Sequence, residues 1–436
     1  MNQHQSSRRD FLKTSAVAAG AAATTLGIAR NAHAAGGDVL KIALIGCGGR
    51  GTGAAANCLT VQKILGQKIQ LVALADAFEN RAKSSLSSLK REFPDQVSVQ
   101  PDRVFVGLDA YQKAIDSGVD IVLLGTPPGF RPQHYAAAIA AGKHVFMEKP
   151  CCTDAPGYRS LLETNKAADA KDLKVVVGLQ RRHQTDYLYG VQKIHDGELG
   201  KIQFLRVFWN GSGGGARDLG PRPQNDPREM EFQIRNWGCF LWLYGDNIVE
   251  QHVHNIDIAN WVMCRDGNVL KAHPAEANGM GGRVNAGNYG DIFDHHFVEF
   301  TYGDGTKVFS QSRHIGGTWD QVNEFAHGDK QSRIVFQSGG PKLESGNPYD
   351  QEHVDLVKAI LGGKKLNDGW HGAVSSMTAV LGRMATYSGR IVRWDEAVAK
   401  GRSESPERIA FDAAPRHLPG PDGCYPFPMP GRYKAY

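Results

Sequence analysis

The stretch Val39-Leu40-Lys41-Ile42-Ala43-Leu44-Ile45-Gly46-Cys47-Gly48-Gly49-Arg50-Gly51 decides the fold of the first half of this chain. Its first seven residues form an apolar run with β-branched side chains, which predicts a buried strand. The next six follow the pattern Gly-x-Gly-x-x-Gly, and an Ala-rich segment typical of a helix continues from 52 to 65. A strand, a glycine turn and a helix in this order are typical of a dinucleotide-binding site.

Each glycine of this turn has a separate expected role. Gly46 permits the tight turn, Gly48 lets the main chain approach a pyrophosphate, and Gly51 allows the helix to pack closely on the strand. The N–H groups and the partial positive charge of the helix N-terminus suit phosphate groups. The predicted phosphate-binding residues are therefore Gly46, Gly48, Gly49, Arg50 and Gly51.

A second strand-like run, 69–75, ends in Asp76, which lies 25 residues beyond Gly51. This spacing is close to that of the acidic residue that hydrogen-bonds the ribose hydroxyls in dinucleotide-binding folds. A carboxylate there favours NAD because it repels a 2′-phosphate, although the nearby Arg81 leaves NADP open. The alternative role for Asp76 is that of a helix N-cap before the helical segment 78–89.

The alternation of strands and helices continues along the chain. Strand-like runs at 119–125 and 143–147 each follow a helical segment, which predicts a parallel, doubly wound sheet. Ligands of such sheets bind at the carboxyl ends of the strands. Besides the glycine turn and Asp76, the cofactor crevice is therefore expected to include Thr126, Pro127, His134, Glu148 and Lys149.

In this order and spacing, Gly46–Gly51, Asp76, Thr126-Pro127-Pro128 and Glu148-Lys149-Pro150 resemble the Gfo/Idh/MocA oxidoreductase family over about residues 39–400. The resemblance implies an α/β protein with an N-terminal Rossmann domain and a C-terminal α/β domain built on a large, mostly antiparallel open sheet. That sheet usually mediates oligomers in the family, so a homodimer or homotetramer is expected. The strand-like runs of the second half agree with such a sheet: 201–209, 293–302, 307–314 and 332–336.

The same resemblance implies three catalytic residues, Lys149, Glu250 and His254. Lys149 occupies the position of the family's active-site lysine, which hydrogen-bonds the reacting oxygen. The family pattern Asp-x-Gly-x-His-x-x-Asp matches at His254, the general base, and at Asp257. Glu250 replaces its first Asp and His252 replaces its Gly. On a single helix Glu250 and His254 would share a face, because they are four residues apart.

Further polar and aromatic side chains are candidates for contacts with a carbohydrate substrate. Gln180-Arg181-Arg182-His183 follows a strand-like run at 174–179, and Trp237 precedes the histidine motif. The predicted substrate-binding residues are Arg182, His183, Trp237, His252 and Asp257.

A metal site at Glu250, His252 and His254, with His295-His296 elsewhere, is an alternative interpretation. Two histidines and a carboxylate form catalytic zinc sites in other proteins. On a helix, however, His252 and His254 point apart, so no metal is expected. The adjacent Cys151-Cys152 are expected to be reduced packing residues.

The N-terminal segment, 1–34, has the three-part layout of an export signal. Ser7-Arg8-Arg9-Asp10-Phe11-Leu12-Lys13 resembles the twin-arginine signal, an apolar run follows from 16 to 28, and Ala32-His33-Ala34 suits cleavage. The apolar run is too short for a comfortable membrane span of about 20 residues. We therefore expect a protein that is periplasmic or otherwise exported through the twin-arginine pathway, with no stable membrane insertion after removal of the signal.

The composition agrees with a globular protein of more than one domain. The 436 residues carry a net charge of +5, and three of these positive charges belong to the signal. No basic stripe with interleaved aromatic residues is present, so no nucleic-acid partner is expected. The predicted division is a signal at 1–34, a Rossmann domain at 35–150, a substrate and oligomerisation domain at 151–414, and an extended arm rich in Pro, Gly and aromatic residues at 415–436.

Three functions are compatible with these features. The first is an NAD(P)-dependent oxidoreductase that acts on a sugar, glycoside or polyol hydroxyl, with a tightly bound, recycled cofactor because free NAD is scarce outside the cytoplasm. The second is redox-neutral glycoside cleavage by transient oxidation and elimination, with Glu250 and His252 as a second acid–base pair. The third is a non-catalytic sugar or dinucleotide sensor, which the retention of Lys149 and His254 disfavours.

Overall fold

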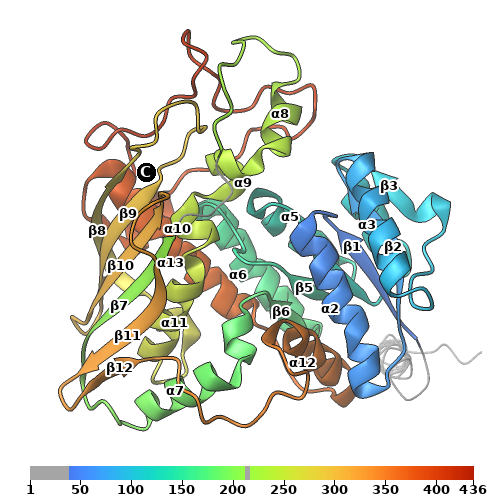
Figure 1. The fold of residues 1–436 in the computed structure, drawn as a ribbon, viewed down its shortest axis with the longest axis horizontal. Helices are drawn as coiled ribbons and strands as arrows, with labels where there is room; N and C mark the ends of the chain where they lie inside the picture. Colours follow the sequence, from blue (N-terminus) through green and yellow to red (C-terminus); the bar gives the residue numbers. More distant parts are fainter. Residues whose placement is uncertain (1–38, 212–216) are drawn as a thin grey trace, which may run out of the picture.

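The computed structural model of the chain describes residues 39–211 and 217–436. The predicted export signal lies outside these described residues. Within them, no helix is both long and apolar enough to cross a membrane. The described chain forms two sheets, with helices between them and on the outer side of the first sheet (Figure 1).

The first sheet consists of six strands: β1 (Leu40–Ile45), β2 (Ile69–Asp76), β3 (Val104–Val106), β4 (Ile121–Leu124), β5 (His144–Met147) and β6 (Val175–Val177). All are parallel, in the order β3-β2-β1-β4-β5-β6, which confirms the predicted Rossmann fold. The strand order reverses between β1 and β4, the place where such sheets bind their ligands. The domain boundary predicted at residue 150 falls between β5 and β6, and the division of the chain stays a prediction.

Helices cover both faces of this sheet: α2 (Gly49–Leu65), α3 (Glu79–Glu92), α4 (Ala110–Ile115), α5 (Arg131–Ala140), α6 (Ala155–Ala170) and α12 (Pro348–Gly362). Successive strand side chains point to opposite faces. Ile42 and Leu44 therefore join the core that contains α2, α3 and α12, whereas Ala43 and Ile45 join the core on the other face, with α4, α5 and α6. α12 comes from the second half of the chain and packs on α2.

The second sheet consists of seven strands: β7 (Ile202–Gly211), β8 (Pro274–Gly282), β9 (His295–Tyr302), β10 (Lys307–His314), β11 (Gln321–Gly328), β12 (Ser332–Ile334) and β13 (Val392–Arg393). They lie in the order β12-β11-β7-β10-β9-β8-β13. Only β7 and β10 pair in parallel, so the sheet is mostly antiparallel, as the resemblance implied.

The remaining helices are α7 (Thr185–His195), α8 (Glu229–Arg235), α9 (Leu241–Tyr244), α10 (Asn247–Glu250), α11 (Val253–Met263), α13 (Gly369–Ser388) and α14 (Trp394–Lys400). Figure 1 shows α10, α11 and α13 between the second sheet and the Rossmann domain. They present the 250–254 segment toward the carboxyl edge of the first sheet. The opposite face of the second sheet carries no helix from the described parts of the chain (Figure 1).

Three strands of the second sheet were not predicted from the sequence: the two-residue β13, β8 and β11. β8 contains three glycines and no β-branched residue, but a Cβ at Gly279 would lie 2.6 Å from the carbonyl oxygen of Phe297, so the glycine allows close pairing with β9. β11 points the carboxylate of Glu324 into the core, where the side chain is 0% exposed. Apolar periodicity does not reveal a strand whose central inward residue is charged.

The C-terminal segment 415–436 contains no helix or strand and packs on the body of the molecule near α8 and α9 (Figure 1). The ring of Tyr425 is buried 4.9 Å from that of Phe240, and its hydroxyl donates to Glu229. Gln233 Nε2 donates to the carbonyl oxygen of His417 at 2.8 Å. The segment thus holds α8 in place.

The close packing of the glycine turn on α2 makes the stability of the fold sensitive to a side chain at Gly51. A Cβ at Gly51 would lie 1.9 Å from the carbonyl oxygen of Gly46, whereas a Cβ at Gly49 would meet nothing within 4 Å. We expect Gly51→Ala to lower the free energy of unfolding by about 3 kcal/mol or more, because the helix must move off the strand. Gly49→Ala should change it by no more than about 1 kcal/mol, since alanine favours the helix. Denaturant unfolding of both variants measures the difference, and equal stabilities would contradict the account.

Candidate active site

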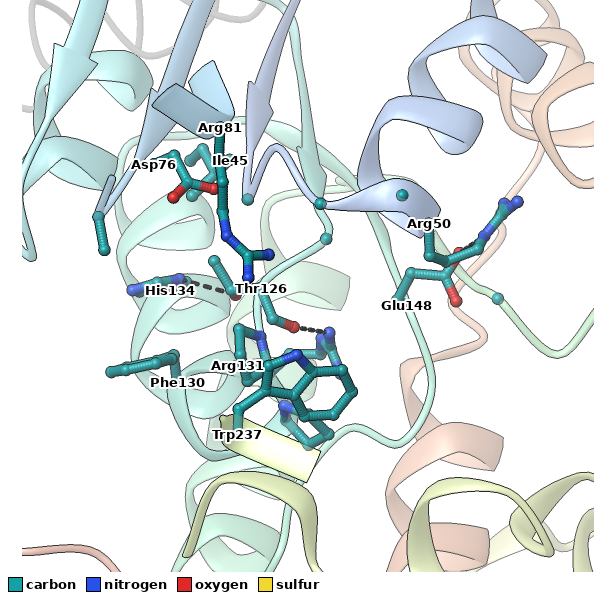
Figure 2. Close-up of a pocket in the computed structure, with 18 of the residues that line it drawn as sticks. Ile45, Arg50, Asp76, Arg81, Thr126, Phe130, Arg131, His134, Glu148 and Trp237 are labelled. Carbon is teal, nitrogen blue, oxygen red and sulfur yellow. Dashed lines mark hydrogen bonds and ion pairs between the residues drawn. The ribbon is translucent and has the colours of Figure 1, made fainter. Parts of the chain in front are cut away.

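A cleft of about 440 Å³ lies at the carboxyl edge of the Rossmann sheet. One wall is formed by the β1–α2 turn and by the ends of β2, β4 and β5, and Figure 2 shows part of it. The other wall comes from the second half of the chain, including Trp209, Ile234 and Tyr349. The predicted site residues that line this cleft are Gly46, Gly48, Gly49, Arg50, Asp76, Thr126, Pro127, His134, Glu148, Lys149, Trp237, Glu250 and His254.

The glycine turn has the shape that a pyrophosphate needs. Gly46 has φ +93°, and a Cβ there would lie 2.4 Å from the amide nitrogen of Thr126. Gly51 does not line the cleft, because it packs against Gly46. Gly48, the N-cap of α2, provides no side-chain cap, and the space beside Gly49 is open, so the N–H groups of the first turn of α2 remain available to a phosphate. These features fit a dinucleotide.

Asp76 stands at the end of β2 with its carboxylate held by the main chain. Cys47 N donates to Oδ2 at 2.7 Å and Phe78 N donates to Oδ1 at 2.9 Å. The N-cap residue of α3 is Phe78, so the alternative role of Asp76 as that N-cap is wrong. Arg81 also lines the cleft and lies beside Asp76 in Figure 2.

The loop after β4 supplies an uncharged, aromatic part of the wall. The Nδ1 atom of His134 lies 3.2 Å from Thr126 Oγ1, and the imidazole stacks on Tyr111 and Phe130 with ring centroids 4.2 and 5.8 Å away. Burial, with help from the charge of Arg131, lowers the pKa of His134 to about 3. This imidazole is therefore neutral in the ordinary pH range.

Arg131 joins two strand ends, and sequence analysis missed it. Its guanidinium is 1% exposed and donates to the carbonyl oxygens of Thr126, after β4, and Pro150, after β5 (Figure 2). Pro150 directly follows Lys149. Arg131 therefore fixes the main chain that carries the lysine, a role that no local sequence pattern indicates.

Lys149 connects the Rossmann domain with the second half of the chain. Its Nζ donates to the carbonyl oxygen of Glu250 at 2.6 Å and to the carboxylate oxygen Oε1 of the same residue at 2.9 Å. An ammonium group has three donors, so one N–H remains for a ligand. The neighbouring Glu148 is paired with Arg50, with 2.5 Å between Oε1 and Nε.

Glu250 and His254 do not share one helix, so that prediction is wrong. α10 ends at Glu250 and α11 begins at Val253. Both side chains nevertheless line the cleft. The carboxylate oxygen Oε2 of Glu250 and the ring nitrogen Nδ1 of His254 are buried and have no hydrogen-bond partner within the described chain. Unpaired buried polar atoms in a cleft are places for groups of a ligand.

The imidazole of His254 is held neutral. Burial lowers the pKa of His254 well below its ordinary value, and the charges of Lys149 and Arg181 lower it further. Its ring stacks on Trp209 at a centroid distance of 5.8 Å. Behind Trp209, Arg181 pairs with the buried carboxylate of Glu324, which also accepts a hydrogen bond from Asn255. This polar cluster supports the Trp209–His254 stack from the side of the second sheet.

Four predicted substrate ligands lie outside the cleft, so the expectation that they contact substrate there is not met. Arg182 forms two hydrogen bonds of 2.8 and 2.9 Å with Asp257, which is 1% exposed. His183 lies between Asp355 and Asp368 on another surface. The chain turns between α10 and α11, which directs His252 to Ser310 Oγ at 2.8 Å in the core.

The metal alternative fails for the same reason, because His252 points away from Glu250 and His254. Within residues 39–211 and 217–436, no group of three His, Cys, Asp or Glu side chains is arranged to hold a metal ion. All seven cysteines are unpaired, and Cys151 and Cys152 are buried.

Sequence analysis also missed residues that line the cleft from distant parts of the chain, namely Trp209, Tyr349, Tyr111 and Gln180. Gln180 begins the 3₁₀ helix Gln180–His183, which is the next element after β6. The sequence indicated this turn, but not that its first side chain enters the cleft while Arg182 and His183 point away. The sequence held one signal for a residue of this kind: Trp209 is an aromatic residue near the end of the predicted strand that became β7.

The environment of His183 generates a prediction. Burial disfavours the charged ring, but the hydrogen bond to Asp355 and the negative charge of Asp368, 3.4 Å from Nε2, outweigh it and raise the pKa of His183 to about 10. The protonated ring of His183 therefore contributes its full stabilisation below the pKa of a histidine in the unfolded chain, about 6.5. This contribution is lost as the pH rises through the folded-state pKa of about 10. We expect His183→Gln to lower the free energy of unfolding at pH 6 by about 1–3 kcal/mol, with a smaller loss at pH 10, and to leave KM unchanged. A raised KM with unchanged stability would restore the role in substrate binding.

Comparison with known proteins supports an NAD-binding Rossmann fold. Residues 40–179 match the GFO_IDH_MocA oxidoreductase family with an NAD-binding Rossmann fold, and residues 5–25 match the twin-arginine translocation signal. The chain is 30% identical to scyllo-inositol 2-dehydrogenase (NADP(+)) IolW of Bacillus subtilis over 171 residues, 39% of this chain and 42% of that protein. It is 24% identical to myo-inositol 2-dehydrogenase of Thermotoga maritima over 316 residues, 68% of this chain and 82% of that protein.

The fold is shared with solved structures. Scyllo-inositol dehydrogenase from Lactobacillus casei, with bound NAD(H) and scyllo-inositol, superimposes with a TM-score of 0.58 at 18% identity and covers 82% of this chain and 100% of that one. The chain thus spans less than half the length of IolW in sequence, but most of the Lactobacillus protein in fold. Residues 40–179 thus match the NAD-binding Rossmann domain of the Gfo/Idh/MocA oxidoreductase family, and the chain shares the two-sheet fold of the solved Lactobacillus structure.

Proposed function

We propose that this protein is an exported NAD-dependent oxidoreductase that acts on a hydroxyl group of a sugar, glycoside or polyol. The observation that carries the proposal is the convergence of Lys149, Glu250 and His254 beside the dinucleotide cleft. Two of these side chains keep a buried polar atom without a partner in the described chain. The inositol dehydrogenases among the relatives act on cyclic polyols, which supports the substrate class.

The residues around the glycine turn fit the cofactor. The N-terminus of α2, with Gly48 and Gly49, would hold the pyrophosphate. Asp76 would accept the ribose hydroxyls, and its charge favours NAD over NADP because it repels a 2′-phosphate. His134 and Thr126 would line the nicotinamide half. When bound, the dinucleotide supplies the acceptor for the hydride.

The chain's own residues handle the proton and the charge on oxygen. His254 is neutral and can accept the proton of the substrate hydroxyl as a general base. The third N–H of Lys149 can donate to the same oxygen and stabilise the negative charge that develops on it. Glu250 orients Lys149 by accepting from it and leaves Oε2 for another substrate hydroxyl.

The export signal implies that the protein must retain its dinucleotide after it leaves the cytoplasm. The twin-arginine pathway carries folded proteins, and the destination we propose is the periplasm, where free NAD is scarce. Retention of the dinucleotide would therefore be required, and the packing above the cleft supports it. The guanidinium of Arg235 lies 3.7 Å from the ring centroid of Phe78, and Phe411 of the C-terminal region lies 5.9 Å from the same ring. Phe78 itself lines the cleft.

Redox-neutral glycoside cleavage is less well supported. It needs a second acid–base pair, and the candidate for it was His252 with Glu250. The ring of His252 is 0% exposed and bonds Ser310, so it cannot reach a group in the cleft. Net oxidation or reduction needs only Lys149 and His254 and is the function that the geometry favours.

The roles of Lys149 and His254 can be tested together with cofactor retention. We expect the purified protein to release a stoichiometric amount of dinucleotide on denaturation. Lys149→Met should keep the dinucleotide but lower kcat about 10²–10³-fold, and His254→Asn should lower it about 10²–10⁴-fold. Products from a panel of sugars and polyols, read by mass spectrometry, measure this. Lys90→Met, on the exposed end of α3, is the matched control. Unchanged turnover in Lys149→Met and His254→Asn, or a protein that binds no dinucleotide, would contradict the proposal.

The helix-free face of the second sheet is the surface we propose for a homo-oligomer. It carries aromatic side chains on neighbouring strands, among them Phe204 with Phe309 at 5.9 Å, and the exposed Phe297 and Met280. Apolar patches of this kind mark interaction surfaces. Light scattering should give the mass of a dimer or tetramer for the parent protein and that of a single chain for Phe297→Glu combined with Met280→Glu. A parent protein that is monomeric at micromolar concentration would exclude this surface.

A further inference from the structure

The end of the cleft around Lys149 has unpaired hydrogen-bond acceptors but no free cation among the residues that the structure describes. Three buried atoms there have no partner within the described chain: Glu250 Oε2, Gln180 Oε1 and His254 Nδ1. The first two are obligate acceptors, and the third is an acceptor in the tautomer that a general base needs. A ligand that satisfies them must bring several hydrogen-bond donors.

The cations at this end are already committed. Arg50 pairs with Glu148, and two of the donors of Lys149 are used by Glu250. Arg131 gives both terminal nitrogens to the carbonyl oxygens of Thr126 and Pro150 and is 1% exposed, which leaves only its buried Nε without a partner. The remaining cation of the cleft, Arg81, lies at the glycine turn, where its Nη1 is 3.6 Å from the position that a Cβ of Gly48 would take.

Gln180 has a place in this arrangement that no sequence pattern suggested. Its Nε2 donates to the hydroxyl of Tyr349 at 3.3 Å, which orients the amide and leaves Oε1 as a fixed acceptor. The residue follows β6, and β6 pairs with β5, the strand that leads to Lys149. Gln180 therefore stands on the same edge as the catalytic lysine.

We infer that the substrate is an uncharged polyhydroxylated compound and that Gln180 and Glu250 select it against sugar acids and sugar phosphates. A hydroxyl group donates to one of the free acceptors and can accept from Lys149. A carboxylate or phosphate has no donor for these atoms, meets the charge of Glu250 and finds no unpaired cation to compensate it. The inference rests on the proposed function and adds the selection by charge.

The test uses the dinucleotide-loaded protein and ligand pairs in which one neutral hydroxyl or hydroxymethyl group is replaced by an anionic group. The pairs are myo-inositol with myo-inositol 1-phosphate, and methyl β-D-glucopyranoside with methyl β-D-glucuronide. Binding is measured by calorimetry and hydride transfer by the absorbance of the bound cofactor. We expect the neutral member of at least one pair to bind and to reduce the cofactor, and its anionic partner to bind at least about tenfold more weakly.

Two substitutions of Gln180 distinguish the effect of its hydrogen-bond acceptor on ligand binding from the effect of charge. Gln180→Met removes the acceptor and should weaken the neutral ligand about tenfold, whereas Gln180→Glu keeps an acceptor, adds a charge and should widen the preference for the neutral member. Glu250→Gln removes the charge and should narrow that preference in the binding assay. Circular dichroism and dinucleotide content establish that each variant is folded.

The possible outcomes distinguish a failure of the selection by charge from a failure of the proposed oxidoreductase activity. An anionic member that binds as tightly as its neutral partner and is oxidised would overturn the selection by charge and leave the oxidoreductase intact. The selection is likewise overturned if Gln180→Met leaves the binding of the neutral ligand unchanged. If no member of either pair binds or reduces the cofactor, the proposed action on sugars and polyols fails, and the inference fails with it.

Discussion

The contact between Lys149 and Glu250 is the constraint on which the site depends. Lys149 Nζ reaches the carbonyl oxygen of Glu250 at 2.6 Å and its carboxylate at 2.9 Å, so the end of β5 in the Rossmann sheet is tied to the end of α10 in the second half. The chain turns directly after Glu250, which places His254 on the cleft and His252 in the core. Arg131 completes the arrangement by fixing the main chain beside the lysine.

Much of the Rossmann half could be predicted from the sequence, because its signals are local. Buried parallel strands appear as continuous apolar runs, and the glycine turn has one structural solution when a strand precedes it and a helix follows. Gly46, Gly51 and Asp76 lie where that reasoning placed them. Lys149 and His254 were implied by the family resemblance, and both line the cleft.

The second half was predicted less completely, because its decisive features are tertiary. Nearness to a motif in the chain does not fix the direction of a side chain, so Arg182 and His252 were assigned to a substrate that they do not face in this structure, while Gln180 was overlooked. Trp209 reaches the site only because β7 pairs with β10 and β11 and directs it inward. The buried carboxylate of Glu324 hid β11 from a search for apolar periodicity.

The fate of the hydrogen that leaves the substrate decides whether this cleft is a site of oxidation. The protein, with its dinucleotide bound, would be mixed with a polyol deuterated at its carbinol carbons, in one turnover. We expect deuterium on the nicotinamide ring of the bound dinucleotide, and its appearance about 10²–10⁴-fold more slowly when His254 is replaced by Asn. A substrate that is converted without any deuterium appearing on the dinucleotide would contradict the assignment of this cleft as the site of oxidation.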